Sequence, residues 1–255
     1  WLKPFWLKAM AAPSSASPVF QGLVGEHLLA SQYRQLHLAD VVGANSWAID
    51  LAGERAGQLR FPPSDLAFSA RLLGSISYDS HTWLWGWANA GVPAEVVLRL
   101  DAEACPELSQ AQSAVPEGVD DDAFGHQIAA VACGLAGGHA YYRGPTGPHG
   151  AAFFVITDPA FPRREEETVG DALRLVTTIC SALELGWVPV PAAAVAEFLV
   201  GRGWTPAAPH AFELEGMKLA LEVDADGRVR SIESELQSIE SELSPPGEQQ
   251  QQQQV

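Results

Sequence analysis

The sequence predicts an α+β fold in which a curved antiparallel sheet of about six or more strands is covered by helices. Three observations lead to this prediction. Short segments rich in β-forming residues follow one another between residues 47 and 89, separated by turn residues. Longer segments with few helix breakers lie on both sides of them. Hydrophobic residues make up 47% of the 255 residues, which is enough for a sizeable core.

The folded part of the chain is expected to begin with a helix and four strands. Residues 21–38 contain several apolar residues and few breakers, which predicts a helix. The β-rich segments then predict strands over 47–51, 58–61, 67–77 and 82–89. Because the turns between these strands are short, we expect an antiparallel meander.

Two helices and two further strands are predicted in the middle of the chain. Helices are expected over 93–108 and 122–135. The second follows the acidic run 120–122, whose negative charge complements the dipole at a helix N-terminus. A divalent-cation site at this run would need further carboxylates from elsewhere in the chain. Strands are expected over 139–143 and 151–157, joined by a loop rich in Gly and Pro.

The last third of the chain predicts two helices and a hairpin. A long helix is expected over 165–185, and a shorter one over 191–200, which starts with Pro and is followed by Gly. Two strands are expected over 217–223 and 228–232. The segment between them, Asp-Ala-Asp-Gly, is a strong hairpin signal.

Composition divides the chain into four parts. Residues 1–18 are a terminal arm and linker, 19–160 a core α+β domain with a tryptophan strand, 161–235 a helical and hairpin continuation packed on the core, and 236–255 an acidic and glutamine-rich tail. A repeat over 231–244 has heptad spacing and predicts a short amphipathic helix, whose first residues could still belong to the preceding strand. The terminal segments could dock to a partner, or the first could simply pack on its own domain.

The net charge limits the kinds of partner. The chain has 31 acidic and 15 basic residues, a net charge of −16, and no Lys or Arg between Arg99 and Arg143. Nucleic acid and anionic lipid are poor candidates as the main partner, because both require clustered positive charge. We therefore expect a protein or a small molecule.

The cysteines and the apolar runs indicate a soluble cytoplasmic protein. Cys105, Cys133 and Cys180 lie far apart and form no C-x-x-C pair, which is typical of small buried residues in a reducing compartment. Without ligand spacing around them, we expect no metal and no cofactor. The longest apolar run is too short and too interrupted by Gly and Pro for a transmembrane segment.

The most specific feature is the row Trp83, Trp85 and Trp87, which occupies every second position of the predicted strand 82–89. Alternation places the three indoles on one face of that strand. The row is either the floor of the core or an exposed platform for a ligand or partner, with a partly open pocket between these extremes. The small residues opposite and Gly86 favour a bent strand with its indoles mainly inside.

Polar residues near this strand are candidates for binding or chemistry. His81 and Asp79 could act as an acid–base pair, although Asp is also an ordinary turn residue. Asn89 lies at the far end of the strand, about 25 Å from His81 at about 3.3 Å per residue, so the two cannot share a site. Tyr141 and Arg143 share a strand face. The guanidinium could hold a carboxylate or phosphate group, or could stack on an aromatic ring and pair with a carboxylate of the chain.

Several of these segments resemble an uncharacterised bacterial domain family with a T-W-L-W-x-W-A-N signature. The resemblance runs from about Trp47 to Asp158 and rests on Leu73-Gly74-Ser75-Ile76-Ser77, Thr82-Trp83-Leu84-Trp85-Gly86-Trp87-Ala88-Asn89, Tyr141-Tyr142-Arg143 and Phe153-Phe154-Val155-Ile156-Thr157-Asp158. It implies a soluble, intracellular protein. No established activity, cofactor or catalytic residue comes with the resemblance.

The sequence favours a non-catalytic binding or protein-interaction module over an enzyme. It contains no G-x-S-x-G, no H-E-x-x-H and no phosphate-binding glycine loop. The alternative is a small-molecule enzyme or ligand-binding pocket at the face of the tryptophan strand. No catalytic residue is assigned, and the candidate residues for binding a ligand or partner are Trp83, Trp85, Trp87, His81, Asn89, Tyr141 and Arg143.

Overall fold

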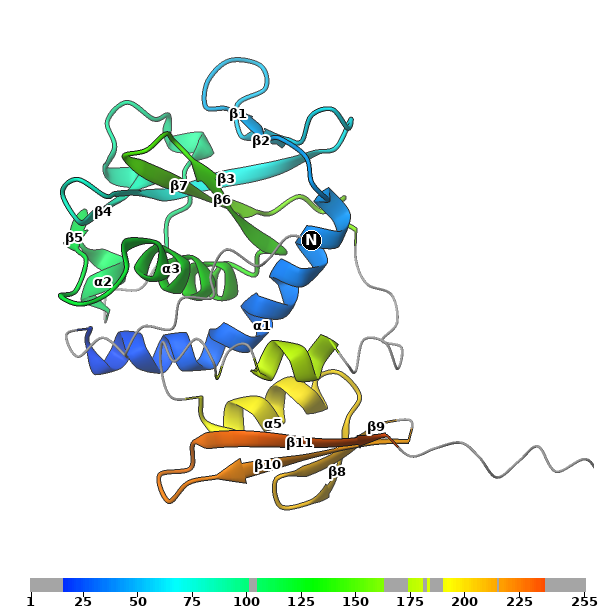
Figure 1. Ribbon diagram of the computed structural model, residues 1–255. Helices are drawn as coiled ribbons and strands as arrows, with labels where there is room; N and C mark the ends of the chain where they lie inside the picture. The colour runs from blue at the N-terminus through cyan, green and yellow to red at the C-terminus, as the bar shows by residue number, and fades with distance from the viewer. Residues whose placement is uncertain are drawn as a thin grey trace, which may run out of the picture.

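The computed structural model describes residues 16–100, 105–162, 174–180, 183, 190–214 and 216–236. These residues form two antiparallel sheets, one of seven strands and one of four. In Figure 1, α1 (Pro18–Val42) and α3 (Asp121–Leu135) lie beneath the larger sheet, and α5 (Ala192–Val200) lies between α1 and the smaller sheet. The α+β class and the antiparallel sheet predicted from the sequence are confirmed.

The larger sheet is built around β3 (Ala67–Ser77). The predicted meander is present, because neighbours pair antiparallel in the order β1 (Ala48–Asp50), β2 (Gln58–Arg60), β3, β4 (Thr82–Trp85) and β5 (Gln112–Ala114). The other strand that pairs with β3 is β7 (Gly150–Ile156), which also pairs with β6 (Ala140–Pro145). Every residue of β7 is buried, so this strand lies inside the sheet with both of its faces covered.

A β-bulge bends β3. The register between β3 and β7 shifts between Leu72 and Gly74, which leaves Leu73 as an extra residue. Leu73 packs in the apolar cluster on the helix side of the sheet, and Leu72 packs in the cluster on the opposite side. Because a bulge bends its strand and increases the local twist, it gives a physical cause for the curvature predicted for this sheet.

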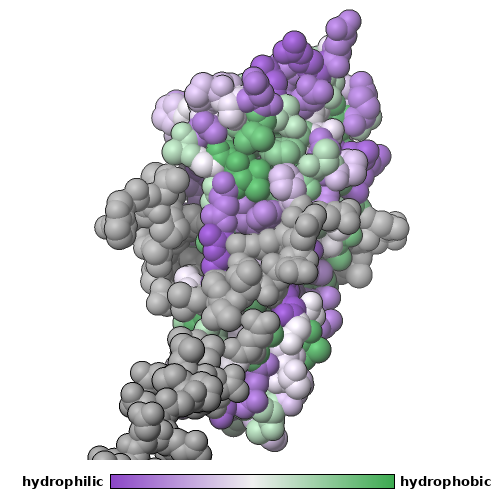
Figure 2. All heavy atoms as spheres, turned by 90° about the vertical axis from the view of Figure 1, so that its right-hand side faces the viewer, coloured by the Kyte–Doolittle hydropathy of each residue, from purple (hydrophilic) through white to green (hydrophobic). Residues whose placement is uncertain are grey.

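Both faces of the larger sheet are apolar. On the helix side, β4 and β7 pack against α1 and α3 through large buried residues: Phe20, Leu28, Phe124, Ile128, Trp83, Trp85 and Phe153. On the other side, the aromatic residues Phe61, Phe68 and Phe154 form a second cluster. This second cluster reaches the surface through partly buried apolar residues, and an apolar patch ringed by hydrophilic residues is visible in the upper half of Figure 2.

Helix α1 is longer at both ends than the predicted range 21–38. At its start, the Ser17 hydroxyl accepts a hydrogen bond from the Phe20 N–H, and the same hydroxyl donates to Glu107 at 2.8 Å. At its end, Gly43 adopts φ +62°, a backbone conformation that favours glycine. The prediction from apolar spacing stopped short of both ends, because the capping residues Ser17 and Gly43 lie outside the apolar pattern.

Two predictions in the middle of the chain are wrong. The strand predicted over 82–89 ends at Trp85, and a 3-10 turn, η1 (Gly86–Ala88), follows it. In place of the single helix predicted over 93–108, the chain has two short helical segments, η2 (Ala94–Val96) and α2 (Pro106–Ser109). Residues 97–100, which follow η2, run along β3 instead, where Val97 bridges to Leu72 and the Leu98 N–H donates to the Leu72 carbonyl at 2.9 Å, so pairing with the sheet overrides helix propensity there.

The smaller sheet has the order β11-β10-β9-β8. The predicted hairpin is confirmed as β10 (Met217–Val223) and β11 (Val229–Leu236), and Asp224 in its turn accepts hydrogen bonds from the N–H groups of Asp226 and Arg228. The sequence did not predict β8 (Thr205–Ala208) and β9 (Ala211–Leu214). Helix α5 confirms the prediction over 191–200.

Several predictions fall partly outside the described residues. Of the helix predicted over 165–185, residues 174–180 and 183 are described, and they are helical. Residues 231–236 of the predicted amphipathic helix form a strand instead, because they pair with β10, and the rest of that repeat is not described. Residues 1–15 of the terminal arm and 237–255 of the tail also lie outside the described ranges.

Two glycine substitutions are expected to change stability in opposite directions. A Cβ at Gly74 would lie 2.6 Å from both the Leu84 carbonyl oxygen and Trp83 Cζ2, whereas a Cβ at Gly22 of α1 would meet nothing within 4 Å. We expect Gly74→Ala to lower the free energy of unfolding by about 1–3 kcal/mol and Gly22→Ala to raise it by about 0.5–1 kcal/mol. Urea denaturation measures both, and changes of the same sign would contradict this packing.

Candidate functional site

Two of the three tryptophans in the row lie in the core. Trp83 and Trp85 are both 0% exposed. The Trp83 ring centroid lies 5.4 Å from that of Phe153 and 5.6 Å from that of Trp85. Trp85 Nε1 donates a hydrogen bond to the Glu107 carbonyl at 3.2 Å. These two indoles are therefore part of the packing between the sheet and the helices, as the bend and the small opposite face predict.

Trp87 is not part of this row, because η1 turns the chain away after Trp85. It is half-buried, and the Arg99 guanidinium lies 5.5 Å from the centroid of its ring. Asn89, at the end of the same turn, uses its side-chain oxygen to accept a hydrogen bond from the Gly91 N–H at 3.0 Å. The row predicted to hold three indoles on one strand thus holds two.

Arg143 lies in a hydrogen-bonded network that joins β6 to the start of α3. Its Nε and Nη2 donate to the two carboxylate oxygens of Asp122 at 2.9 and 2.8 Å, a bidentate pair. The Tyr78 hydroxyl accepts from Arg143 at 2.6 Å and donates to Asp122 at 2.8 Å. Burial, helped by the hydrogen bond to Asp122, raises the pKa of Tyr78 to about 12. The network therefore holds a neutral tyrosine between opposite charges at neutral pH.

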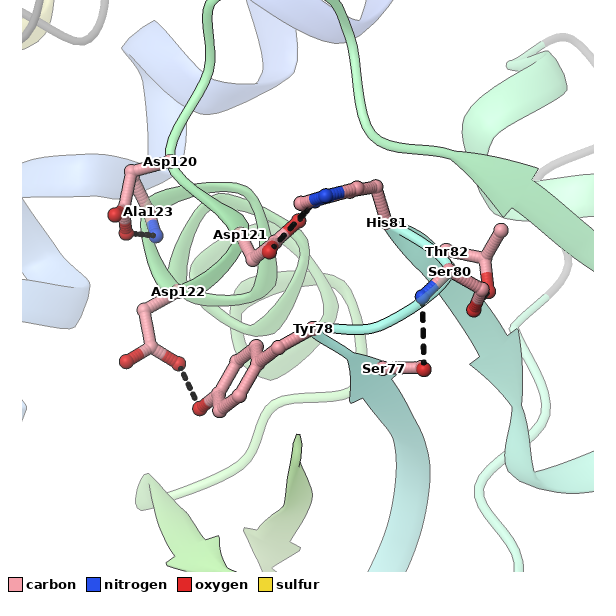
Figure 3. Close-up of polar contacts among 9 residues, drawn as sticks. All are labelled: Ser77, Tyr78, Ser80, His81, Thr82, Asp120, Asp121, Asp122 and Ala123. Carbon is pink, nitrogen blue, oxygen red and sulfur yellow. Dashed lines mark hydrogen bonds and ion pairs between the residues drawn. The ribbon is translucent and has the colours of Figure 1, made fainter. Parts of the chain in front are cut away.

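The acidic run at the start of α3 makes three different contacts, which Figure 3 shows together. Asp120 caps the helix by accepting from the Ala123 N–H at 3.1 Å. Asp121 lies 3.0 Å from Nδ1 of His81, whose imidazole is mainly exposed. Asp122 accepts from Tyr78. Asp120 thus stabilises the first turn of α3, whereas Asp121 and Asp122 connect that turn to residues of the segment between β3 and β4.

One helical turn further along α3, His126 lies beside Tyr141. The distance from His126 Nδ1 to the Tyr141 hydroxyl is 2.9 Å. Burial lowers the pKa of His126 to about 4, and burial also raises the pKa of Tyr141. Both groups are therefore neutral at pH 7.

Of the seven predicted site residues, Trp83 and Trp85 pack together in the core, and three others make polar contacts with side chains of α3. His81, Tyr141 and Arg143 all contact α3, whereas Trp87 and Asn89 lie in η1 and the turn after it. The sequence argument missed Asp122 and His126 as their partners. The spacing of the residues could have indicated this pairing. Asp122 and His126 are four residues apart and so share a helix face, and Tyr141 and Arg143 are two residues apart and so share a strand face.

Within the described ranges, no group of three or more His, Cys, Asp or Glu side chains is placed to hold a metal ion. In the same part of the chain, no helix combines the length and the apolar character needed to cross a membrane.

The outer face of the smaller sheet carries a hollow of about 330 Å³. Helix α5 packs on the inner face, and no described helix lies over the outer one (Figure 1). Alanine side chains form the floor of the hollow and charged side chains its rim: Ala207, Ala211 and Ala220, with Glu213, Lys218, Glu233 and Glu235. The register places Lys218 between Glu213 and Glu235.

Comparison with known proteins gives a family. A family model described as "Family of unknown function (DUF6882)" matches residues 21–159, which is more than half of the chain. No curated protein and no solved structure matches.

The His126 pKa gives a prediction for stability against pH. An unfolded histidine titrates near pH 6.5 and the folded one near pH 4, so between these values the unfolded chain binds a proton that the folded chain does not. Above pH 6.5 the neutral His126 costs the folded state nothing from this difference. As the pH falls from 6.5 toward 4, the difference in proton binding lowers the free energy of unfolding by up to about 3 kcal/mol. We expect His126→Gln to lose less stability than the wild type between pH 7 and 4.5 in urea denaturation. If the wild type and His126→Gln lose the same free energy of unfolding over this pH range, the lowered pKa of His126 is contradicted.

Proposed function

We propose that this chain, which belongs to the DUF6882 family, is a non-catalytic protein-interaction module whose contact surface is the outer face of the smaller sheet. The observation that carries the proposal is the hollow on that face, which has an apolar floor and a charged rim. Uncovered concave surfaces that combine apolar and charged groups are suited to recognising another protein.

The charge of this face favours a basic protein partner. Four exposed carboxylates, Glu213, Glu222, Glu233 and Glu235, surround a single ammonium group, that of Lys218. Lys and Arg side chains of a partner would lay their aliphatic stems on the alanine floor and place their charges beside the carboxylates. The net charge of −16 would speed the approach of such a partner.

The polar groups at the larger sheet support a structural role for that region. Asp122, Arg143 and Tyr78 are hydrogen-bonded to one another, and His126 is hydrogen-bonded to Tyr141. A catalytic acid or base must come within hydrogen-bond reach of a substrate. In this arrangement these groups instead fix α3 on the sheet.

The alternative considered from the sequence, a ligand pocket at the face of the tryptophan strand, has less support. Trp83 and Trp85 are buried against Phe153 and the helices. A ligand would have to displace these contacts to reach the indoles, whereas no described helix covers the outer face of the smaller sheet.

An affinity capture with matched variants tests this proposal. Ala220→Arg would fill the hollow and place a positive charge among the carboxylates, and Ala220 is exposed, so the fold should tolerate it. We expect this variant to recover a partner at least about tenfold less than the wild type, which corresponds to about 1.4 kcal/mol. Quantitative mass spectrometry of the captured proteins measures the ratio.

The control is Ala52→Arg, which makes the same substitution at an exposed position of the loop between β1 and β2. This variant should recover the same partner as the wild type. A partner set that is unchanged by Ala220→Arg, or lost equally with Ala52→Arg, would argue against the outer face as the contact surface.

A further inference from the structure

A row of polar side chains follows one face of α1. His27, Ser31, Arg34 and Gln35 have the spacing i, i+4, i+7 and i+8, which places them on one helix face. Ser31 is 2% exposed, and the other three residues are half-buried. Each contributes a buried atom without a hydrogen-bond partner: His27 Nε2, Ser31 Oγ, Arg34 Nη1 and Gln35 Nε2.

This row faces the C-terminal part of α3. The His27 imidazole rests on Gly134, because a Cβ at Gly134 would lie 2.5 Å from His27 Nδ1. The Arg34 guanidinium lies near the thiol of Cys133, the neighbouring residue on α3, where it acts to lower the pKa of the thiol against the larger effect of burial. The two contacts place both ends of the row against the same stretch of α3.

The chemistry of the row is that of hydrogen-bond donors. A guanidinium and an amide nitrogen can only donate, and a hydroxyl can donate as well as accept. Burial, with the charge of Arg34 acting in the same direction and that of Glu26 opposing it, lowers the pKa of His27, so its imidazole is neutral at pH 7 and can also donate. Within the described ranges no ion pair joins Arg34 to a carboxylate, although its Nη1 is buried and a buried charged group is normally paired.

We propose that this row binds a small oxyanion, a carboxylate or phosphate group, between α1 and the C-terminal part of α3. The anion would accept hydrogen bonds from Arg34, Ser31 and Gln35, and the guanidinium would supply the charge. Ser31 lies in the interior, whereas Arg34 and Gln35 are half-buried, so the row joins the surface of α1 to its buried face. This site is separate from the proposed contact surface on the smaller sheet and does not depend on it.

The test is the thermal unfolding midpoint of the full chain in sodium phosphate and, separately, in sodium acetate, at constant ionic strength set with sodium chloride. We expect a saturable rise of the midpoint with at least one of the two anions. The two series distinguish a phosphate site from a carboxylate site. Arg34→Gln removes the guanidinium and should raise the half-saturating concentration on the order of 10- to 100-fold.

Arg55→Gln is the matched control, because it removes an exposed guanidinium from the loop between β1 and β2, and it should leave the half-saturating concentration unchanged. Gln35→Leu provides a second variant that keeps the charge, and it should raise that concentration roughly fivefold. The proposal is overturned by a midpoint that shows no saturable rise with either anion. It is also overturned if Arg34→Gln and Gln35→Leu both respond like the wild type.

Discussion

The indole of Trp83 lies directly on the backbone of Gly74, so close that even a methyl group at that position would collide with it. The same kind of contact recurs twice in the layer beneath the sheet. The Phe153 ring lies on Gly125 of α3, and the His27 imidazole lies on Gly134 of the same helix. Rings packed on glycine backbone set the distance from the sheet to α3 and from α3 to α1, and the Trp83 ring lies close against the backbone of β3. The rest of the layered structure depends on these close approaches.

The short distance between α3 and the sheet explains the polar contacts at their boundary. It brings Asp122 and His126 on one face of the helix within reach of Arg143 and Tyr141 on one face of β6. Titratable groups that sequence reasoning would place in an active site are thereby used to hold the helix. The smaller sheet differs, because α5 covers one face of it and its other face presents carboxylates around an alanine floor.

The sequence predicts regular elements well where the local signal agrees with the packing. The limits of β3 were predicted without error, and α3, α5 and the β10–β11 hairpin were found. Failures occur where a distant contact decides the structure. Gly86 lies so close to Leu72 that a Cβ there would be 2.9 Å from the Leu72 carbonyl oxygen, and this approach accompanies the end of β4. The partners of Arg143 and Tyr141 depend on how α3 is placed over the sheet, which no local pattern encodes.

Trp83 and Trp85, the two indoles of the tryptophan strand, lie in the core. The most direct test is oxidation of the folded chain with N-bromosuccinimide, followed by mass mapping of the tryptophan-containing peptides. Because Trp83 and Trp85 are fully buried and Trp87 is half-buried, oxidation is expected at Trp87 while the other two stay intact. Oxidation of Trp83 or Trp85 at the same rate as Trp87, in a chain that is still folded, would show that these two indoles are not buried.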